Sequence, residues 1–296
     1  MNYYNDIKTK LIENENYAKI KNYSKERYKV QTYYEVGKML NDAGKEYGEN
    51  IIGQYAERLQ IELGKKYSER TLYGMRKYYE VFSNQKLNAL CSILSWSHYR
   101  ELIKIKDTDK IYYYVNQSSI RNLSVRELTN IIKDKEYERL NESTKQKLIN
   151  QEKPTIQELI KNPIIIHSKN PTTNVSEKDL QNIILENIPY FLKELGNKFS
   201  FIDNEYKIKI GDRYNYIDLL LYNIEYKCYV VIELKVTELK KEHIGQIETY
   251  MHYIDKNIKS IEENNTIGII ICKKDNQFIM EYCSDPRILS RQYILK

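Results

Sequence analysis

The amino-acid sequence predicts an α+β chain of two domains, an all-α domain of helix-turn-helix type followed by an α/β domain with a central mixed sheet. The chain has 296 residues, roughly the length of two average domains. Apolar residues recur at helical spacing through the first half, whereas apolar runs of strand length alternate with helical stretches after residue 176. We expect the first domain over residues 1–150, a linker over 151–176 and the second domain over 177–296.

Composition excludes several classes of protein. There is no apolar run long enough to span a membrane, and the first ten residues lack the apolar core of a secretory signal. The four cysteines are scattered without a C-x-x-C pair, which argues against a disulfide scaffold or a structural zinc site. These features favour the cytoplasm. The chain also lacks the glycine-rich phosphate loops of nucleotide-binding proteins, so use of ATP is not expected.

Positive charge is concentrated in the first half of the chain. The net charge is +6, from 47 Lys and Arg against 41 Asp and Glu. Residues 1–150 hold 27 basic and 20 acidic side chains, while residues 151–296 hold 20 and 21. An anionic partner such as DNA would explain this excess, but a solvated helical surface explains it equally well.

Tyrosine is unusually frequent, with 29 residues against 5 Phe and 1 Trp. The simpler explanation is an AT-rich coding sequence, which favours Tyr codons together with those of Lys, Asn and Ile. Tyrosine nevertheless combines an apolar ring with a polar tip, so some of these rings can serve at interfaces.

The first half reads as a succession of amphipathic helices. Apolar spacing predicts helices over residues 29–40 and 51–63, and Gly64 stands where a helix is expected to end. Ser68 is the expected N-cap of a third helix. We expect the buried stripe of this helix to comprise Leu72, Met75, Tyr79 and Phe82. Further helices are expected at 87–106, 109–116 and 124–132, the last with a capping box formed by Ser124 and Glu127.

The helices at 51–63 and 68–82 have the proportions of a helix-turn-helix. The second helix would then present its N-terminal half to the bases of DNA. We expect Lys65, Lys66, Arg70, Thr71, Tyr73 and Lys77 to contact DNA, with Arg76 adding positive charge. The alternative is an ordinary helical hairpin with a basic surface. We expect Trp96 to lie in the core and His98 to have a capping or packing role.

The second half changes character after a proline-rich segment. Three of the five prolines lie between residues 141 and 176, with a short helix expected over 156–160. A helix is expected over 176–195 with a kink at Pro189. Strands are then expected at 199–210, 216–222, 228–234, 266–272 and 278–282, with a helix at 240–254.

Three charged residues stand out within this second half. Asp218 lies inside the apolar run 216–222, and Glu233 and Lys235 end the apolar run 228–235. Side chains two apart on a strand share a face, and a hairpin through residues 223–227 would bring Asp218 opposite Glu233. Two adjacent carboxylates repel each other, which favours a bound divalent cation such as Mg²⁺.

This arrangement suits phosphodiester hydrolysis. The metal would neutralise phosphate charge and activate a water molecule, while Lys235 would hold or deprotonate that water or stabilise the developing charge. The Glu-x-Lys pattern is not specific by itself, since it recurs at 205–207, 225–227 and 238–240. The alternative is a buried salt bridge of Asp218 or Glu233 with Lys235, which would be a weak source of stability.

Several longer segments match a known family. In the second half these are Phe191–Gly196, Tyr216–Tyr222, Val231–Lys235, Gly245-Gln246 with Tyr250, and Ile267–Cys272. In the first half they are Ser68–Tyr79, Leu94–Tyr99 and Ser124–Leu128. Over nearly its whole length the chain resembles the YhcG-like PDDEXK nucleases of the PD-(D/E)XK superfamily.

The resemblance implies a restriction-endonuclease-like second domain and a winged-helix-like first domain. It implies that Asp218 and Glu233 are metal ligands, that Lys235 is the catalytic lysine, and that Gln246 orients the nucleophile or a phosphate. Glu186 falls where related nucleases place a helical acid that supports the metal. The alternative interpretation, that Glu186 is a solvated residue on the helix surface, is equally well supported. Ile217 occupies the position of the proline that names the motif, and this is a departure from the family pattern.

The leading hypothesis is therefore a Mg²⁺-dependent DNA endonuclease, with Mn²⁺ as a substitute metal and a DNA-binding first domain. A homodimer and a role in defence, restriction or mobile-element systems fit this reading. The alternative is a catalytically silent nucleic-acid-binding or scaffold subunit of a larger complex. RNA as the substrate ranks last, because no RNA-binding motif is present.

Overall fold

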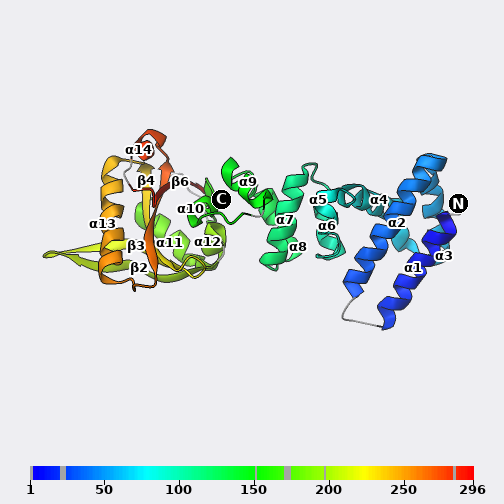
Figure 1. The fold of residues 1–296 in the computed structure, drawn as a ribbon, viewed down its shortest axis with the longest axis horizontal. Helices are drawn as coiled ribbons and strands as arrows, with labels where there is room; N and C mark the ends of the chain where they lie inside the picture. The colour runs from blue at the N-terminus through cyan, green and yellow to red at the C-terminus, as the bar shows by residue number, and fades with distance from the viewer. Residues whose placement is uncertain (1–2, 21–24, 151, 170–174, 197, 283–284) are drawn as a thin grey trace. The chain divides into compact units, whose positions relative to one another are not determined.

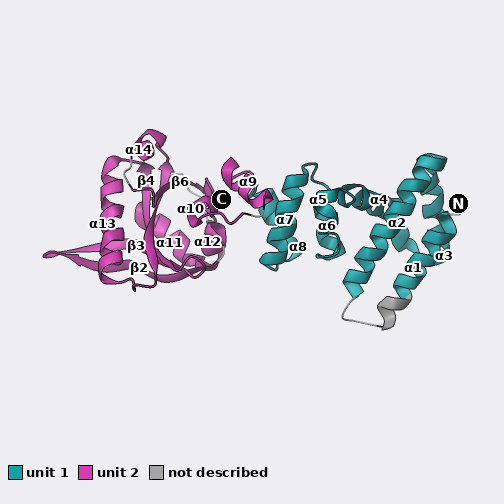
Figure 2. Ribbon diagram, in the orientation of Figure 1, with its two compact units in different colours: residues 1–137 teal, residues 138–296 magenta. Residues whose placement is uncertain are grey.

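A computed structural model describes residues 3–20, 25–150, 152–169, 175–196, 198–282 and 285–296 (Figure 1). Pro171 and Cys283 lie outside the described residues. The chain divides into two compact units, Met1–Tyr137 and Glu138–Lys296 (Figure 2). Among the described residues, every helix is too short or too polar to cross a lipid bilayer.

The first unit is helical throughout its described part. Its elements are α1 (Tyr3–Ile20), α2 (Lys25–Tyr47), α3 (Asn50–Leu63), a 3₁₀ turn (Lys65–Tyr67), α4 (Glu69–Phe82), α5 (Gln85–Asn88), α6 (Trp96–Leu102), α7 (Thr108–Ile120) and α8 (Val125–Lys133). The described residues of this unit contain no strand, so the β-wing expected of a winged-helix domain is not found among them. Helices α3 and α4, joined through the 3₁₀ turn, keep the predicted helix-turn-helix order.

Helices α2 and α4 pack closely at Gly37 of α2, which has no side chain. A Cβ atom on Gly37 would lie 2.2 Å from the carbonyl oxygen of Met75. Any larger residue at position 37 would force the two helices apart, so the glycine sets their spacing.

An aromatic cluster forms the core beneath α4. Tyr78 is fully buried, with ring centroids 4.8 Å from Tyr99, 5.0 Å from Phe82 and 5.6 Å from Trp96. The prediction that Trp96 is a core residue is confirmed. The prediction of Tyr79 in the buried stripe was wrong, because the helix turns Tyr78 towards the other rings and leaves Tyr79 partly exposed.

Local sequence signals predicted several helix ends correctly. Ser124 and Glu127 form the expected capping box. His98 has the packing role that was one of its two expected roles, because its ring lies 2.7 Å from the Ser95 hydroxyl and 2.9 Å from the Leu123 carbonyl oxygen. The single helix expected over 87–106 was wrong, because the chain turns between α5 and α6. The Tyr99 hydroxyl stabilises that turn by accepting three consecutive backbone N–H groups, those of residues 92–94.

The second unit is built around a mixed sheet, as predicted, but the sheet has six strands and includes β1 (Ile164–Ile166) and β6 (Ile288–Leu295), which were not expected. Its other strands are β2 (Phe199–Ile210), β3 (Arg213–Asn223), β4 (Cys228–Glu238) and β5 (Asn264–Lys274). Their order across the sheet is β1-β6-β5-β4-β3-β2. The pairs β2–β3 and β3–β4 are antiparallel, whereas β4–β5, β5–β6 and β1–β6 are parallel.

Helices cover both faces of this sheet (Figure 1). Helix α13 (Lys241–Asn257) packs on one face, and α11 (Glu177–Glu186) and α12 (Ile188–Leu195) pack on the other. The remaining helices are α9 (Glu142–Ile149), α10 (Ile156–Leu159) and α14 (Gln277–Glu281). The alternating side chains of β4 divide between the two cores, with Val231 facing α13 and Ile232 facing α11 and α12.

Two predicted elements differ from the structure for local reasons. The kinked helix over 176–195 is two helices that meet at Asn187, because Pro189 lacks an N–H donor and its ring clashes with the preceding turn. The strand expected over 278–282 is helix α14, whose first turn is capped by the Asn276 side chain.

The predicted domain boundary also needs correction. Residues 138–150 belong to the second unit, and the expected linker contributes α10 and the buried strand β1 to its core. Three buried charges hold this segment in place. Arg139 pairs with Glu194 and donates to the Pro163 carbonyl at 2.7 Å, and Lys161 Nζ lies 3.6 Å from Glu194. These contacts connect residues 139–163 to α12.

We predict that Glu194→Ala destabilises the second unit by about 3–5 kcal/mol, because it removes the buried carboxylate that both Arg139 and Lys161 contact. Glu225→Ala removes an exposed pair with Lys153 and is expected to change stability by less than about 1 kcal/mol. Urea unfolding of the full chain measures both. Equal effects would contradict the assignment of residues 138–163 to this unit.

Candidate active site

The three charged residues singled out above, Asp218, Glu233 and Lys235, lie close together where β3 and β4 separate. The last backbone pair of this ladder is Leu219 with Ile232, and the same register places Asp218 opposite Glu233. Asp218 accepts a hydrogen bond at 2.7 Å from the backbone N–H of Leu234. Its own carbonyl accepts one at 2.9 Å from the side chain of Gln181 on α11. Strand β4 and helix α11 therefore both hold Asp218 in place.

Lys235 lies between two carboxylates. Its Nζ is 3.4 Å from Glu233 Oε2 and 3.6 Å from Glu177 Oε2, at the first residue of α11. Glu233 is 1% exposed and Lys235 is 9% exposed, whereas the Glu177 side chain is 46% exposed. The site therefore contains a buried pair, Glu233 and Lys235, and solvent reaches it beside the partly exposed Glu177.

Burial shifts both acids towards their neutral forms. Burial, and next the nearby charge of Asp218, raise the pKa of Glu233 to about 8. Burial also raises the pKa of Asp218, against the hydrogen bond from Leu234. Burial lowers the pKa of Lys235, but the attraction of Glu233 and Glu177 outweighs it, and the pKa lies above its ordinary value.

One atom of this site has no partner in the described part of the protein. Glu233 Oε1 is buried and makes no hydrogen bond, although a buried carboxylate oxygen normally accepts at least one. A hard divalent cation would satisfy it, because such ions prefer carboxylate oxygens. Asp218 and Glu233 therefore fit the predicted metal ligands in chemistry and in position.

Helix α13 places two further predicted residues beside the acids. Gln246 donates to the Tyr250 hydroxyl at 3.1 Å, as their spacing of four on one helix allows. Burial raises the pKa of Tyr250, and the charges of Glu233 and Asp218 add to this effect. His243, one turn earlier, has its pKa lowered by burial and then by Lys235. The sequence analysis did not select His243 for the site.

The structure does not bring Glu186 to this cluster. Its side chain is 59% exposed and pairs with Lys169 at 3.3 Å. It lies nine residues beyond Glu177, about 13 Å along the axis of α11. The helical acid that approaches Lys235 is Glu177, which we did not select. Its position directly after the N-cap Ser176 is the signal that could have identified it.

A second cluster of potential ligands lies elsewhere in this unit. Among the described residues, Glu248, His252 and Asp285 form the one group of three such side chains whose ligand atoms lie within 4.8 Å of one another. Asp285 already accepts hydrogen bonds from the Arg287 guanidinium, the shortest at 2.6 Å. Its charge is therefore compensated without a metal.

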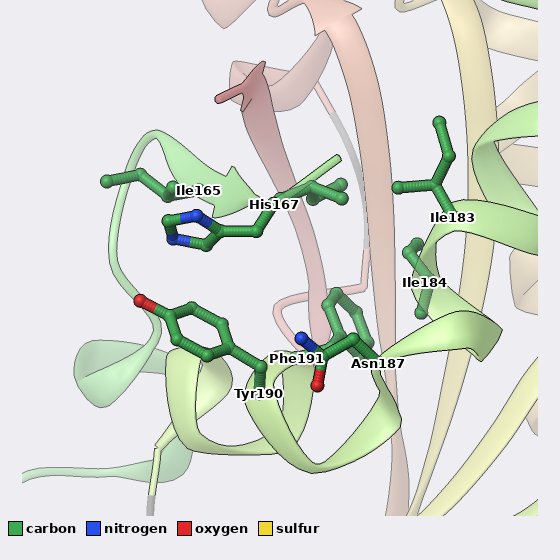
Figure 3. Close-up of a pocket in the computed structure, with 8 residues that line it drawn as sticks. Ile165, His167, Ile183, Ile184, Asn187, Tyr190 and Phe191 are labelled. Carbon is green, nitrogen blue, oxygen red and sulfur yellow. The ribbon is translucent and has the colours of Figure 1, made fainter. Parts of the chain in front are cut away.

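The cavity in Figure 3 is separate from the charged residues. It lies between β1, α11 and α12, where the His167 ring meets Tyr190 edge-on at 4.3 Å and isoleucine side chains form much of the wall. It contains none of Asp218, Glu233 and Lys235, so we do not assign it to the reaction.

The predicted DNA contacts of the first unit lie around the start of α4. Lys65, Lys66, Arg70, Tyr73 and Lys77 are exposed and Thr71 is partly exposed. Lys66 forms a salt bridge with Glu15, in which Nζ lies 2.7 Å from Oε1. Arg76 is held by Glu49 and Glu80, so the structure contradicts its role as free positive charge.

The raised pKa of Glu233 predicts a pH-dependent stability in the absence of metal. Its pKa is about 8 in the folded protein against an ordinary 4.5, so its favourable contribution is complete below about pH 4.5 and is lost as the pH rises through about 8. In EDTA, Glu233→Gln should raise the melting temperature by about 5 °C near pH 9 and have little effect near pH 5. The exposed Glu225→Gln variant should show no such trend, and a Glu233→Gln effect independent of pH would contradict the prediction.

Each half of the chain matches a different protein-family model. Residues 7–139 match the family model described as the DUF1016 N-terminal domain, and residues 157–292 match the YhcG PDDEXK nuclease domain. YhcG of Escherichia coli (strain K12), whose name gives its nuclease activity as unproven, is 24% identical over 283 residues, covering 81% of this chain and 76% of YhcG.

Two solved structures show weaker similarity. The crystal structure of a repair endonuclease from Pyrococcus abyssi is 18% identical with a TM-score of 0.30, covering 42% of this chain and 49% of that one. A complex of EndoMS with double-stranded DNA is 18% identical with a TM-score of 0.32, covering 42% and 46%. This chain thus spans about half of each solved chain. The two family models, separated by residues 140–156, together account for most of the sequence, and the chain combines the two domains of the YhcG-like PDDEXK nucleases.

Proposed function

We propose that this nuclease is a DNA endonuclease that depends on Mg²⁺, or on Mn²⁺ in its place, with Asp218 and Glu233 as the metal ligands. The observation that carries the proposal is the buried, unpartnered Oε1 of Glu233 beside a second carboxylate. Stability alone gives little reason to bury these charges, because replacing a buried ion pair by apolar residues is often neutral or stabilising. When bound, the cation would polarise the scissile phosphate and lower the pKa of a coordinated water.

The protein's own groups would then orient and stabilise the reacting atoms. The Lys235 ammonium is fixed between Glu233 and Glu177, which favours its charged form, so we assign it to stabilising negative charge on the phosphate. The N–H of Leu234 fixes one oxygen of Asp218 and leaves the other to face a metal. Gln246 lies at hydrogen-bond distance from Tyr250, where it can orient a water or a phosphate oxygen.

We also propose that the first unit binds duplex DNA through the exposed residues at the start of α4. Cytoplasmic location, a homodimer that cuts both strands, and a role in defence, restriction or mobile elements remain proposals consistent with the family. Sedimentation of the purified chain with and without DNA tests the dimer.

Substitution at the three central residues tests the proposed chemistry. Asp218→Ala, Glu233→Ala and Lys235→Ala should each lower Mg²⁺-dependent cleavage of plasmid DNA at least about 100-fold, because each removes a metal ligand or a stabilising charge. Glu225→Ala and Lys227→Ala provide a matched Glu-x-Lys pair at the far end of the hairpin and should retain full activity. Equal cleavage by all six proteins would reject the assignment, and DNA binding without any cleavage would favour the scaffold alternative.

The two ends of α11 provide a second matched test. Glu177→Gln should lower the cleavage rate about tenfold by removing one of the two carboxylates that hold Lys235. Glu186→Gln, on the same helix, should have no effect on the rate. Steady-state cleavage assays measure both, and a loss confined to Glu186→Gln would restore the original prediction.

Binding to duplex DNA tests the role of the first unit. Arg70→Ala and Lys77→Ala should each weaken binding and lower the slope of log K against log salt by about 0.9, the value for one phosphate contact. Lys104 is an exposed lysine in the turn after α6, and Lys104→Ala should leave the slope unchanged. Fluorescence anisotropy across a salt series measures the slopes, and three indistinguishable slopes would contradict the proposal.

A further inference from the structure

The β2–β3 hairpin extends beyond the rest of the sheet. β4 pairs with β3 only from Leu219 to Asn223, whereas β2 and β3 remain paired as far as Ile210 with Arg213. Figure 1 shows this part continuing past α13 as a narrow two-stranded ribbon. We refer to residues 206–217 as the arm.

One face of the arm is anchored to the core. Ile208 and Ile217 are buried, and Tyr206 packs beside them against the cluster that includes residues of α13. Tyr206 and Ile217 are backbone partners, and Ile208 lies directly opposite Asn215. The arm is therefore held on its inner face, and its outer face is presented in a defined orientation.

The outer face carries a ladder of lysines and tyrosines. Lys207 lies opposite Tyr216, and Lys209 lies opposite Tyr214. The two rings are 51% and 56% exposed, which is high for large aromatic side chains. The Lys207 ammonium lies 3.9 Å from the centroid of the Tyr214 ring, and that of Lys209 lies 5.9 Å away. Positive charges and aromatic rings thus alternate on one surface.

This ladder leads directly to the catalytic acids. Tyr216 and Tyr214 precede Asp218 on β3 by two and four residues, so the ladder lies on the strand that carries this acid. Tyr216 is about 7 Å and Tyr214 about 13 Å from Asp218 along the strand.

Charge favours the same partner. The arm holds Lys207, Lys209 and Arg213 against one acid, Asp212, whereas residues 151–296 as a whole carry one more acidic than basic side chain. The ribbon therefore carries a local positive excess within a segment that has none overall. A polyanion that passes over the ribbon would reach Asp218 next.

We propose that the arm grips single-stranded DNA next to the cleavage site, with Tyr214 and Tyr216 stacking on unpaired bases and Lys207 and Lys209 contacting phosphates. Exposed rings between basic side chains are typical of surfaces that bind single strands, and the faces of bases inside a duplex are already stacked on one another. The substrate class is then DNA with an unpaired segment beside the scissile bond. This inference rests on the proposed nuclease function and adds the form of DNA that the site accepts.

The test compares ring-conserving with ring-removing variants of the full chain. Tyr214→Phe/Tyr216→Phe keeps both rings, and Tyr214→Leu/Tyr216→Leu keeps apolar side chains without rings. Binding of fluorescein-labelled dT₂₀ and of a 20-base-pair duplex is measured by anisotropy in EDTA, and a gel confirms that the DNA is intact. Circular dichroism confirms that each variant is folded.

We expect the leucine variant to bind dT₂₀ at least about tenfold more weakly and the duplex within about twofold of wild type, and the phenylalanine variant to match wild type on both. Lys207→Gln/Lys209→Gln should lower the salt slope for dT₂₀ by about 1.4, since each phosphate contact on a single strand contributes about 0.7. Unchanged dT₂₀ binding by the leucine variant would overturn the proposal, as would an equal loss on the duplex. Because binding is measured without turnover, this failure is distinct from a failure of the cleavage assays.

Discussion

The site depends on the burial of Glu233 within an apolar strand beside a second carboxylate. Val231 and Ile232 place the preceding part of β4 in the two cores of the sheet, so the strand cannot move to expose the acid to water. The single lysine within reach compensates one of its oxygens and leaves the other without a partner among the described residues. Helix α11 and strand β4 hold the neighbouring charged side chains in position. Gln181 and the N–H of Leu234 fix Asp218, and Glu177 holds the far side of Lys235.

The central residues of the site were predictable because their signal is local. An acid inside an apolar run requires an explanation wherever the run folds, and the strand period of two puts Glu233 and Lys235 on one face. Glu177 carries no such signal, since an acid in the first turn of a helix is favourable for the helix itself. Only the packing of α11 on the sheet brings it to Lys235. For the same reason Glu186 was predicted instead. It lies on the correct helix, α11, but at the opposite end from Glu177.

The parts of the fold that were not predicted depend on distant partners. β1 is three residues long and pairs in parallel with β6, about 130 residues later, so neither the pairing nor the true start of the second unit can be read from nearby residues. Local chemistry decided other cases. Pro189 ended α11 where only a kink was expected, and Asn276 capped a helix where a strand was expected. The strands with strong apolar runs were predicted correctly because burial on both faces leaves little choice of conformation.

The central claim is tested most directly by a crystal structure of the protein grown with Mn²⁺, using anomalous scattering to locate the metal. We predict one strong peak within about 2.0–2.3 Å of Glu233 Oε1, with an oxygen of Asp218 as the second protein ligand. A peak at Glu248, His252 and Asp285 instead, or no peak while Glu233 remains paired with Lys235 alone, would contradict the metal-dependent site proposed for this nuclease.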